Sequence, residues 1–195
     1  SASLVGSEMC IRDRRYRKHS ERKLIMEKEQ LKNDIEGQKA ITNALMDLLN
    51  EYPVLKSIQS IDFSFLEESK GIAFYALGGA VIISDKESVT GNVELKCQYP
   101  FTVVFRDKPV RENRRIEICT FLDNLGRWLE MQPIPTEDGM QQLTEYPELT
   151  EGRKITQIQR TTPAHLDGRT EAGVENWIIG LNLLYEQEYE KEWIL

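Results

Sequence analysis

The sequence holds few of the residues that most catalytic and metal sites require. Among its 195 residues are two histidines, His19 and His165, and three cysteines, at positions 10, 97 and 119. The cysteines lack metal-ligand spacing, and their odd number favours a reducing compartment over a disulfide framework. No serine lies in a G-x-S-x-G motif, and neither histidine has an evident nucleophile or second ligand near it in the sequence. The sequence therefore predicts no enzyme, and no catalytic, cofactor-binding or metal-binding residues.

Several targeting and binding signals are also absent. The longest apolar run falls far short of the roughly 20 residues of a membrane-spanning helix. The chain has no convincing secretory signal and no Asn-x-Ser/Thr acceptor for glycosylation. The pair Gly78-Gly79 is not followed by Gly-Lys-Ser/Thr, so it does not fit a phosphate-binding loop. We expect a soluble globular domain that has no membrane partner.

Charge is distributed unevenly along the chain, whose net charge is −7. Residues 1–32 carry nine Lys/Arg against five Asp/Glu, or +4, which leaves −11 for residues 33–195. Residues 1–14 (SASLVGSEMCIRDR) resemble a translated sequencing-adaptor read-through, so we predict that they are not native. We interpret residues 15–33 as a charged, helix-prone arm and residues 34–195 as a single domain. An acidic domain would repel phosphates, which argues against nucleic-acid reading.

Two stretches have the apolar spacing of helices. In residues 34–50, Ile41, Ala44, Leu45, Leu48 and Leu49 form one stripe, and Asn33 or Asp34 could cap the helix. In residues 112–130, the stripe consists of Ile118, Phe121, Leu122, Leu125, Trp128 and Leu129. Cys119 is expected on the buried side of this second helix. Arg114 and Arg115 are expected on its solvated side, with contact to an acidic neighbour as the alternative.

A long strand is predicted at residues 93–105 (VELKCQYPFTVVF). Every odd position is apolar, and a period of two places these side chains on one face of a sheet. Burying seven such side chains would contribute roughly 10–20 kcal/mol. Pro100 cannot donate to a sheet ladder, so we expect an edge, a bulge or a bend there.

The remaining strands are shorter or less regular in sequence. Residues 61–65 predict a short strand, and the apolar runs at 72–77 and 80–84, joined by Gly78-Gly79, predict a hairpin. Further strands are expected at 155–161 and 174–185, and residues 132–146 and 162–173 are expected to be loops. The fold class predicted is α+β. It consists of a single mixed, mainly antiparallel sheet of about four to six strands with two main helices packed on it.

This order of elements resembles the tail-terminator proteins of long-tailed bacteriophages, which are also described as minor capsid or tail-completion proteins. The resemblance covers residues 31–192. It is carried by YPFTVVFR (99–106), FLDNLGRWLE (121–130), YPELTEGRKITQIQRTTPAHLD (146–167) and ENWIIGLNLLYEQEYE (175–190). These are structural segments rather than sharp motifs, and they bring no catalytic residues with them.

The resemblance implies a structural virion protein at the head-proximal end of a phage tail, assembled in the bacterial cytoplasm. Its copies would form a ring, typically a hexamer, that caps the tail tube, stops its polymerisation and contacts the head-completion or connector protein. DNA would only pass through the lumen. Two alternatives remain: a head–tail connector or other tail-completion adaptor, and, more distantly, a small enzyme using His165. The hairpin near residues 71–84 and the apolar C-terminus, Trp193-Ile194-Leu195, are candidates for reaching a neighbouring subunit; for the C-terminus the alternative is a frayed tail.

Overall fold

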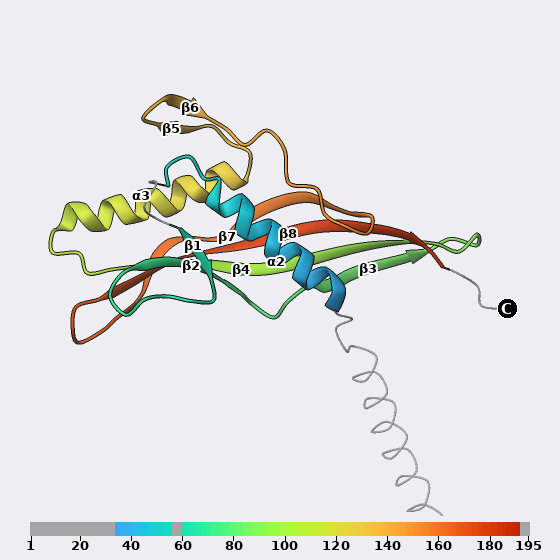
Figure 1. The fold of residues 1–195 in the computed structure, drawn as a ribbon, viewed down its shortest axis with the longest axis horizontal. Coiled ribbons are helices and arrows are strands. Elements are labelled where there is room, and N and C mark those ends of the chain that lie inside the picture. Colours follow the sequence, from blue (N-terminus) through green and yellow to red (C-terminus); the bar gives the residue numbers. More distant parts are fainter. Residues whose placement is uncertain (1–33, 56–59, 192–195) are drawn as a thin grey trace, which may run out of the picture. The chain divides into compact units, whose positions relative to one another are not determined.

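The computed structural model describes residues 34–55 and 60–191. The chain divides into two units, Ser1–Lys32 and Asn33–Leu195, and every described residue belongs to the second unit. Our predictions for residues 1–14 and 15–33, for His19 and for the conformation of Trp193-Ile194-Leu195 fall outside the described residues. Element labels are those of Figure 1.

The described part of the chain has an α+β fold, as predicted. Its sheet has six strands, with the order β1-β2-β4-β8-β7 and with β3 also paired to β4. Only β1 and β2 are parallel, so the sheet is mixed and mainly antiparallel. The strands of this sheet are β1 (Ile61–Phe63), β2 (Gly71–Ala76), β3 (Val81–Glu87), β4 (Asn92–Asp107), β7 (Arg153–Arg169) and β8 (Glu175–Glu190).

Strand β4 is the predicted central strand and pairs with β8 over its whole length. All seven apolar side chains at its odd positions are at most 8% exposed, which confirms the period-two prediction. No bulge occurs at Pro100, because the register between β4 and β8 is continuous there. The irregularity lies instead in the neighbouring strands: β2 ends at Ala76 and β3 begins at Val81, on the same side of β4.

The predicted hairpin between β2 and β3 is therefore wrong. The two strands do not pair with each other; both pair antiparallel with β4 and lie end to end along it. Gly78 and Gly79 both have positive φ, as a primed turn requires, but the connection runs along β4. The Leu77 amide donates to the Pro100 carbonyl at 2.8 Å, which fixes the connection at the gap.

Both described helices lie on the same face of the sheet (Figure 1). Helix α2 (Ile35–Asn50) meets β4 where the hydroxyls of Thr42 and Tyr99 lie 2.9 Å apart. Helix α3 (Glu112–Leu129) meets the same face of β4, where the rings of Phe105 and Phe121 stack edge to face. Both helices have nearly the bounds and the buried stripes that the sequence predicts, with Ala44 and Phe121 only partly buried.

Two predicted loops contain strands. The 132–146 segment includes a small separate sheet made of β5 (Ile134–Thr136) and β6 (Gly139–Gln141). Strand β7 continues through Pro163 and His165 to Arg169, although we expected a loop there. Proline is tolerated because β7 is an edge strand and its register shifts several times in this region.

Candidate functional site

A cleft of about 760 Å³ opens where β4 ends and α3 begins. Its floor includes the Phe105 and Phe121 rings, which lie 5.3 Å apart. Tyr52, which is buried and outside the lining, packs on Phe121 at the same centroid distance. Val54, just after α2, lines the cleft as well. Three separate segments thus contribute to an apolar floor. The volume of the cleft lies in the range found for ligand pockets.

Arg114 organises the charges of the cleft. Its guanidinium pairs with Asp107 at 2.8 Å and with Glu117 at 3.0 Å, and lies 5.7 Å from the centre of the Phe105 ring. Burial alone would lower the pKa of Arg114, but its bonds to both carboxylates outweigh burial and raise the pKa. Of the two alternatives for Arg114, the structure shows the contact with acidic neighbours, because β4 and α3 bring Asp107 and Glu117 to it.

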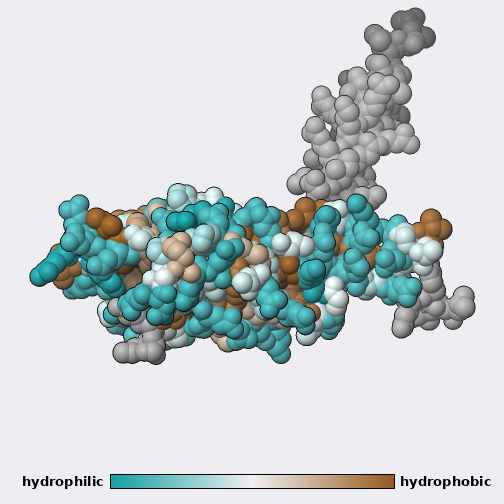
Figure 2. All heavy atoms as spheres, turned by 90° about the horizontal axis from the view of Figure 1, so that it is seen from above, coloured by the Kyte–Doolittle hydropathy of each residue, from teal (hydrophilic) through white to brown (hydrophobic). Residues whose placement is uncertain are grey.

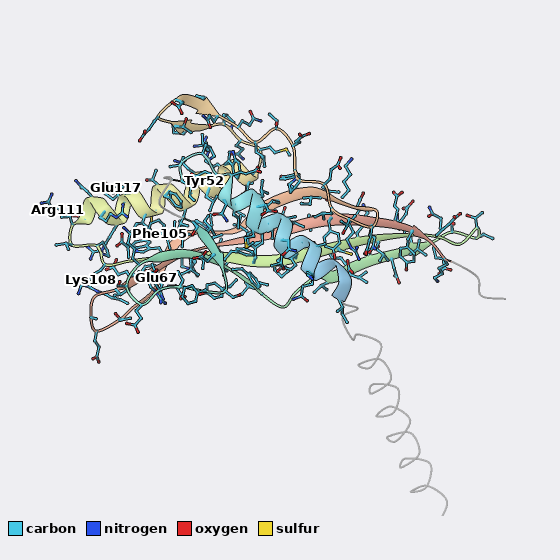
Figure 3. The ribbon with its side chains drawn as sticks, viewed as in Figure 1. Tyr52, Glu67, Phe105, Lys108, Arg111 and Glu117 are labelled. Atoms are coloured by element: carbon cyan, nitrogen blue, oxygen red, sulfur yellow. The ribbon has the colours of Figure 1, made fainter. Side chains whose placement is uncertain are left out.

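The rim of the cleft carries cations and exposed apolar side chains. Lys70 and Lys108 line the cleft and have no ion pair among the described residues. Val110 and Ile116, also in the lining, are 91% and 59% exposed. Figure 3 shows Lys108 and Glu117 near Phe105 at the end of the domain where α3 begins. The cleft thus combines an apolar floor with free positive charge.

The opposite end of β4 and β8 has an acidic character. Residues 85–96 and 186–191 together carry six Asp/Glu and three Lys. Val89, in the connection between β3 and β4, is fully exposed. On the face seen in Figure 2, hydrophobic patches occur at the left end, where α3 begins, and at the right end, where this connection lies. The two ends of the long strands thus both expose apolar side chains but differ in charge, because lysines without an ion pair among the described residues line the cleft and acidic residues are in excess at the other end.

No described helix covers the second face of the sheet. Its centre consists of four cross-strand pairs between β4 and β8, all uncharged: Gln98–Leu184, Pro100–Asn182, Thr102–Gly180 and Val104–Ile178. The Asn182 side chain donates to Gln98 at 3.3 Å, but its Oδ1 atom is buried and accepts no hydrogen bond from the described residues. A buried polar atom without a partner usually costs about 1–3 kcal/mol, so Asn182 is a locally unfavourable position on this face.

A second cluster of ionisable groups is fully internal. Asp34 caps α2 through the Gly37 amide, and it accepts hydrogen bonds from Arg153 on β7 and Tyr185 on β8. Burial alone would raise the pKa of Asp34, but these hydrogen bonds outweigh burial and lower the pKa. Burial raises the pKa of Tyr185. Because the cluster is satisfied internally and closed to solvent, it fastens the start of α2 to the sheet.

Arg115 also contacts an acidic neighbour, the second of the two alternatives for this pair of arginines. It forms a two-pronged pair with Glu175, whose side chain is only 2% exposed. Hydrogen bonds from Arg115 and Trp177 lower the pKa of Glu175 against the opposing effect of burial. This pair holds α3 to the start of β8.

The residues that sequence reasoning weighed for chemistry are scattered. His165 is exposed on the edge strand β7, and its ring Nδ1 lies 2.8 Å from the Pro163 carbonyl oxygen. Cys97 is buried as predicted, whereas Cys119 is only half-buried, contrary to our expectation. Within the described ranges, no group of three or more His, Cys, Asp or Glu side chains is placed to hold a metal ion. Over the same residues, no helix is long and apolar enough to cross a membrane.

Comparison with known proteins adds no family to this description. No protein-family model matches the chain, and no curated protein sequence matches it. The residues of the cleft were also missed by sequence reasoning, because Val54, Lys70 and Phe105 come from segments separated in the chain. The signals in the sequence were Val54, Val110 and Ile116, which line the cleft and are apolar residues outside every predicted stripe.

Proposed function

We propose that this chain is a structural, non-catalytic subunit that associates head to tail with copies of itself into a ring. In the tail-terminator role that its sequence resembles, the ring would cap the tail tube of a long-tailed bacteriophage. It would stop polymerisation of the tube and join it to the head-completion proteins. The subunit would reside in the virion, at the head-proximal end of the tail.

The single observation that carries this proposal is the difference between the two ends of the β4–β8 pair. One end bears a cleft whose free charges, Lys70 and Lys108, are positive, and the other end bears an excess of acidic residues. Unlike surfaces at opposite ends of a subunit favour a heterologous contact, which repeats from copy to copy. Such a contact gives a ring when the rotation between copies closes.

The net charge supports a ring through which DNA passes. Residues 33–195 carry −11, and proteins bind DNA chiefly by neutralising its phosphates with Lys and Arg. A lumen lined by such a domain would let DNA move without holding it.

The proposal is tested by whether the protein assembles into rings, both by itself and in the presence of tail tubes. Light scattering after size-exclusion chromatography and negative-stain electron microscopy should show rings, either in solution or at the ends of added tubes, and tube growth should stop. A protein that stays monomeric and leaves tube growth unchanged would contradict the proposal. Rings that bind a head connector but ignore tubes would support the connector role instead.

A further inference from the structure

The cleft beside Phe105 and the C-terminal segment of the chain have matching chemistry. We propose that the cleft of one subunit binds Trp193-Ile194-Leu195 of a neighbouring copy. This inference rests on the proposed self-association and names the segment that makes the contact. Reach, polarity and charge each support it.

Reach excludes binding of the segment within its own subunit. The last described residue, Lys191, lies at the acidic end of the sheet, where its amide donates to the Gly91 carbonyl at 3.0 Å. Phe105 lies 14 residues beyond Gly91 along β4. At the rise of a strand, this separation is about 45 Å. Leu195 is four residues beyond Lys191 and extends at most about 14 Å from it. Only the cleft of a second copy is within its range.

Both the C-terminal segment and the cleft offer apolar side chains. The segment offers three consecutive large apolar side chains, one of them a tryptophan. The cleft offers the rings of Phe105 and Phe121, together with the exposed Val110 and Ile116 on its rim. Aromatic residues that fill apolar pockets dominate the energetics of many interfaces, so Trp193 is the expected anchor.

The charges that flank the C-terminal segment are opposite in sign to the free charges of the cleft. Glu188, Glu190 and Glu192 precede the apolar segment, and only Lys191 offsets them. Lys70 and Lys108 line the cleft without ion pairs among the described residues, while Asp107 and Glu117 are already paired with Arg114. The acidic residues of one copy would therefore meet free ammonium groups of the next, which favours association and correct register.

Peptide binding tests the contact apart from ring formation. The binder is the full chain lacking residues 192–195, and the probe is a fluorescent peptide of residues 188–195 (EYEKEWIL), prepared with both free and amidated C-termini. Fluorescence anisotropy should show saturable binding that weakens as salt is added. A peptide carrying Trp193→Ala and Ile194→Ala should lose binding by about tenfold or more, since the anchor is removed.

Variants of the binder locate the site. Lys108→Glu and Ile116→Glu change exposed side chains of the rim, so circular dichroism and thermal unfolding should remain unchanged while peptide affinity falls about tenfold. The matched control is Lys154→Glu, an exposed lysine on β7 outside the cleft lining, which should keep the original affinity.

The outcomes separate this inference from the proposed function. Absence of saturable binding, or equal binding by the Lys108→Glu and Lys154→Glu variants, would overturn the inference even if rings form on tail tubes. Peptide binding confined to an intact cleft would support it even if the rings cap a different structure.

Discussion

Asp34 and Arg153 lie 119 residues apart in the sequence and form a two-pronged, buried ion pair. The guanidinium donates from Nε to Oδ2 at 2.8 Å and from Nη2 to Oδ1 at 2.9 Å. The side chains are only 7% and 2% exposed. The pair joins the first residue before α2 to the first residue of β7, and so ties one helix to the edge of the sheet.

Replacement of Arg153 by alanine should strongly destabilise the domain. The change leaves the Asp34 carboxylate buried without its cation, and breaking a buried pair in this way typically costs about 3–5 kcal/mol. Urea denaturation should show a lower midpoint, whereas Lys154→Ala, at the exposed neighbouring position, should change it little. Equal midpoints for the two variants would contradict the role assigned to the pair.

Acid should destabilise the domain through its paired carboxylates. Hydrogen bonds from Arg160 outweigh burial and lower the pKa of Glu130, as Arg153 does for Asp34. Unfolded Asp and Glu titrate at about 3.9 and 4.3, so the unfolded chain binds protons first as the pH falls. Stability is therefore fully present above those values and is lost as the pH drops through the lower folded pKa.

Urea midpoints measured between neutral pH and about pH 3 should decline in the acidic range. Glu130→Gln should have a lower midpoint at neutral pH and a shallower decline, because one of the linked carboxylates is gone. A decline as steep as that of the unaltered chain would show that Glu130 does not contribute.

Gly126→Ala should destabilise the protein, although alanine is the better helix former by about 1 kcal/mol. An added Cβ would lie 2.5 Å from Cδ of Arg160 and 2.8 Å from Cδ1 of Ile179. Arg160 cannot easily withdraw, since its side chain donates three hydrogen bonds to Glu130. We expect a net loss of about 1–2 kcal/mol in thermal or urea unfolding.

The matched control for this substitution is Gly168→Ala on β7. A Cβ there would meet nothing within 4 Å, so stability should stay within about 0.5 kcal/mol of the original. A gain in stability for Gly126→Ala would mean that α3 can shift away from the sheet.

Cys119 should react with thiol reagents before Cys97 does. Burial raises the pKa of both thiols, so both should react slowly at neutral pH and faster as the pH rises. Cys119 is half-buried, whereas Cys97 is 1% exposed beneath the helices. Iodoacetamide labelling of a Cys10→Ser variant, followed by mass spectrometry, should show modification of Cys119 first; simultaneous labelling of both would indicate global opening.

Local periodicity was enough to predict the elements that form the core. The alternation around Tyr99 predicted β4, and the stripes containing Leu45 and Leu122 predicted α2 and α3, because burial on one face imposes a period on the sequence. Residues 162–169 were misread because Pro163 and Gly168 are typical of loops. An edge strand with register shifts tolerates both.

Contacts between elements that are far apart in the chain left no comparable signal in the sequence. The partners Glu175 of Arg115, Asp34 of Arg153 and Asp107 of Arg114 come from other elements, so no local pattern in the sequence points to them. The Gly78-Gly79 pair likewise suggested a hairpin, and only the pairing of β2 and β3 with β4 shows that the two strands do not pair with each other. Both glycines do have positive φ. Local conformation was anticipated at these positions, whereas the partner strand was not.

Pro100 marks a boundary along β4. In an antiparallel ladder the N–H and C=O of one residue point to the same neighbour, and the Pro100 carbonyl accepts from Leu77, in the gap between β2 and β3. The missing donor of Pro100 therefore faces that gap, where no ladder bond is lost. Sliding either strand across position 100 would forfeit a bond and turn its apolar residues to the wrong face. One imino acid thus lets two separate strands share a single edge without competing for it.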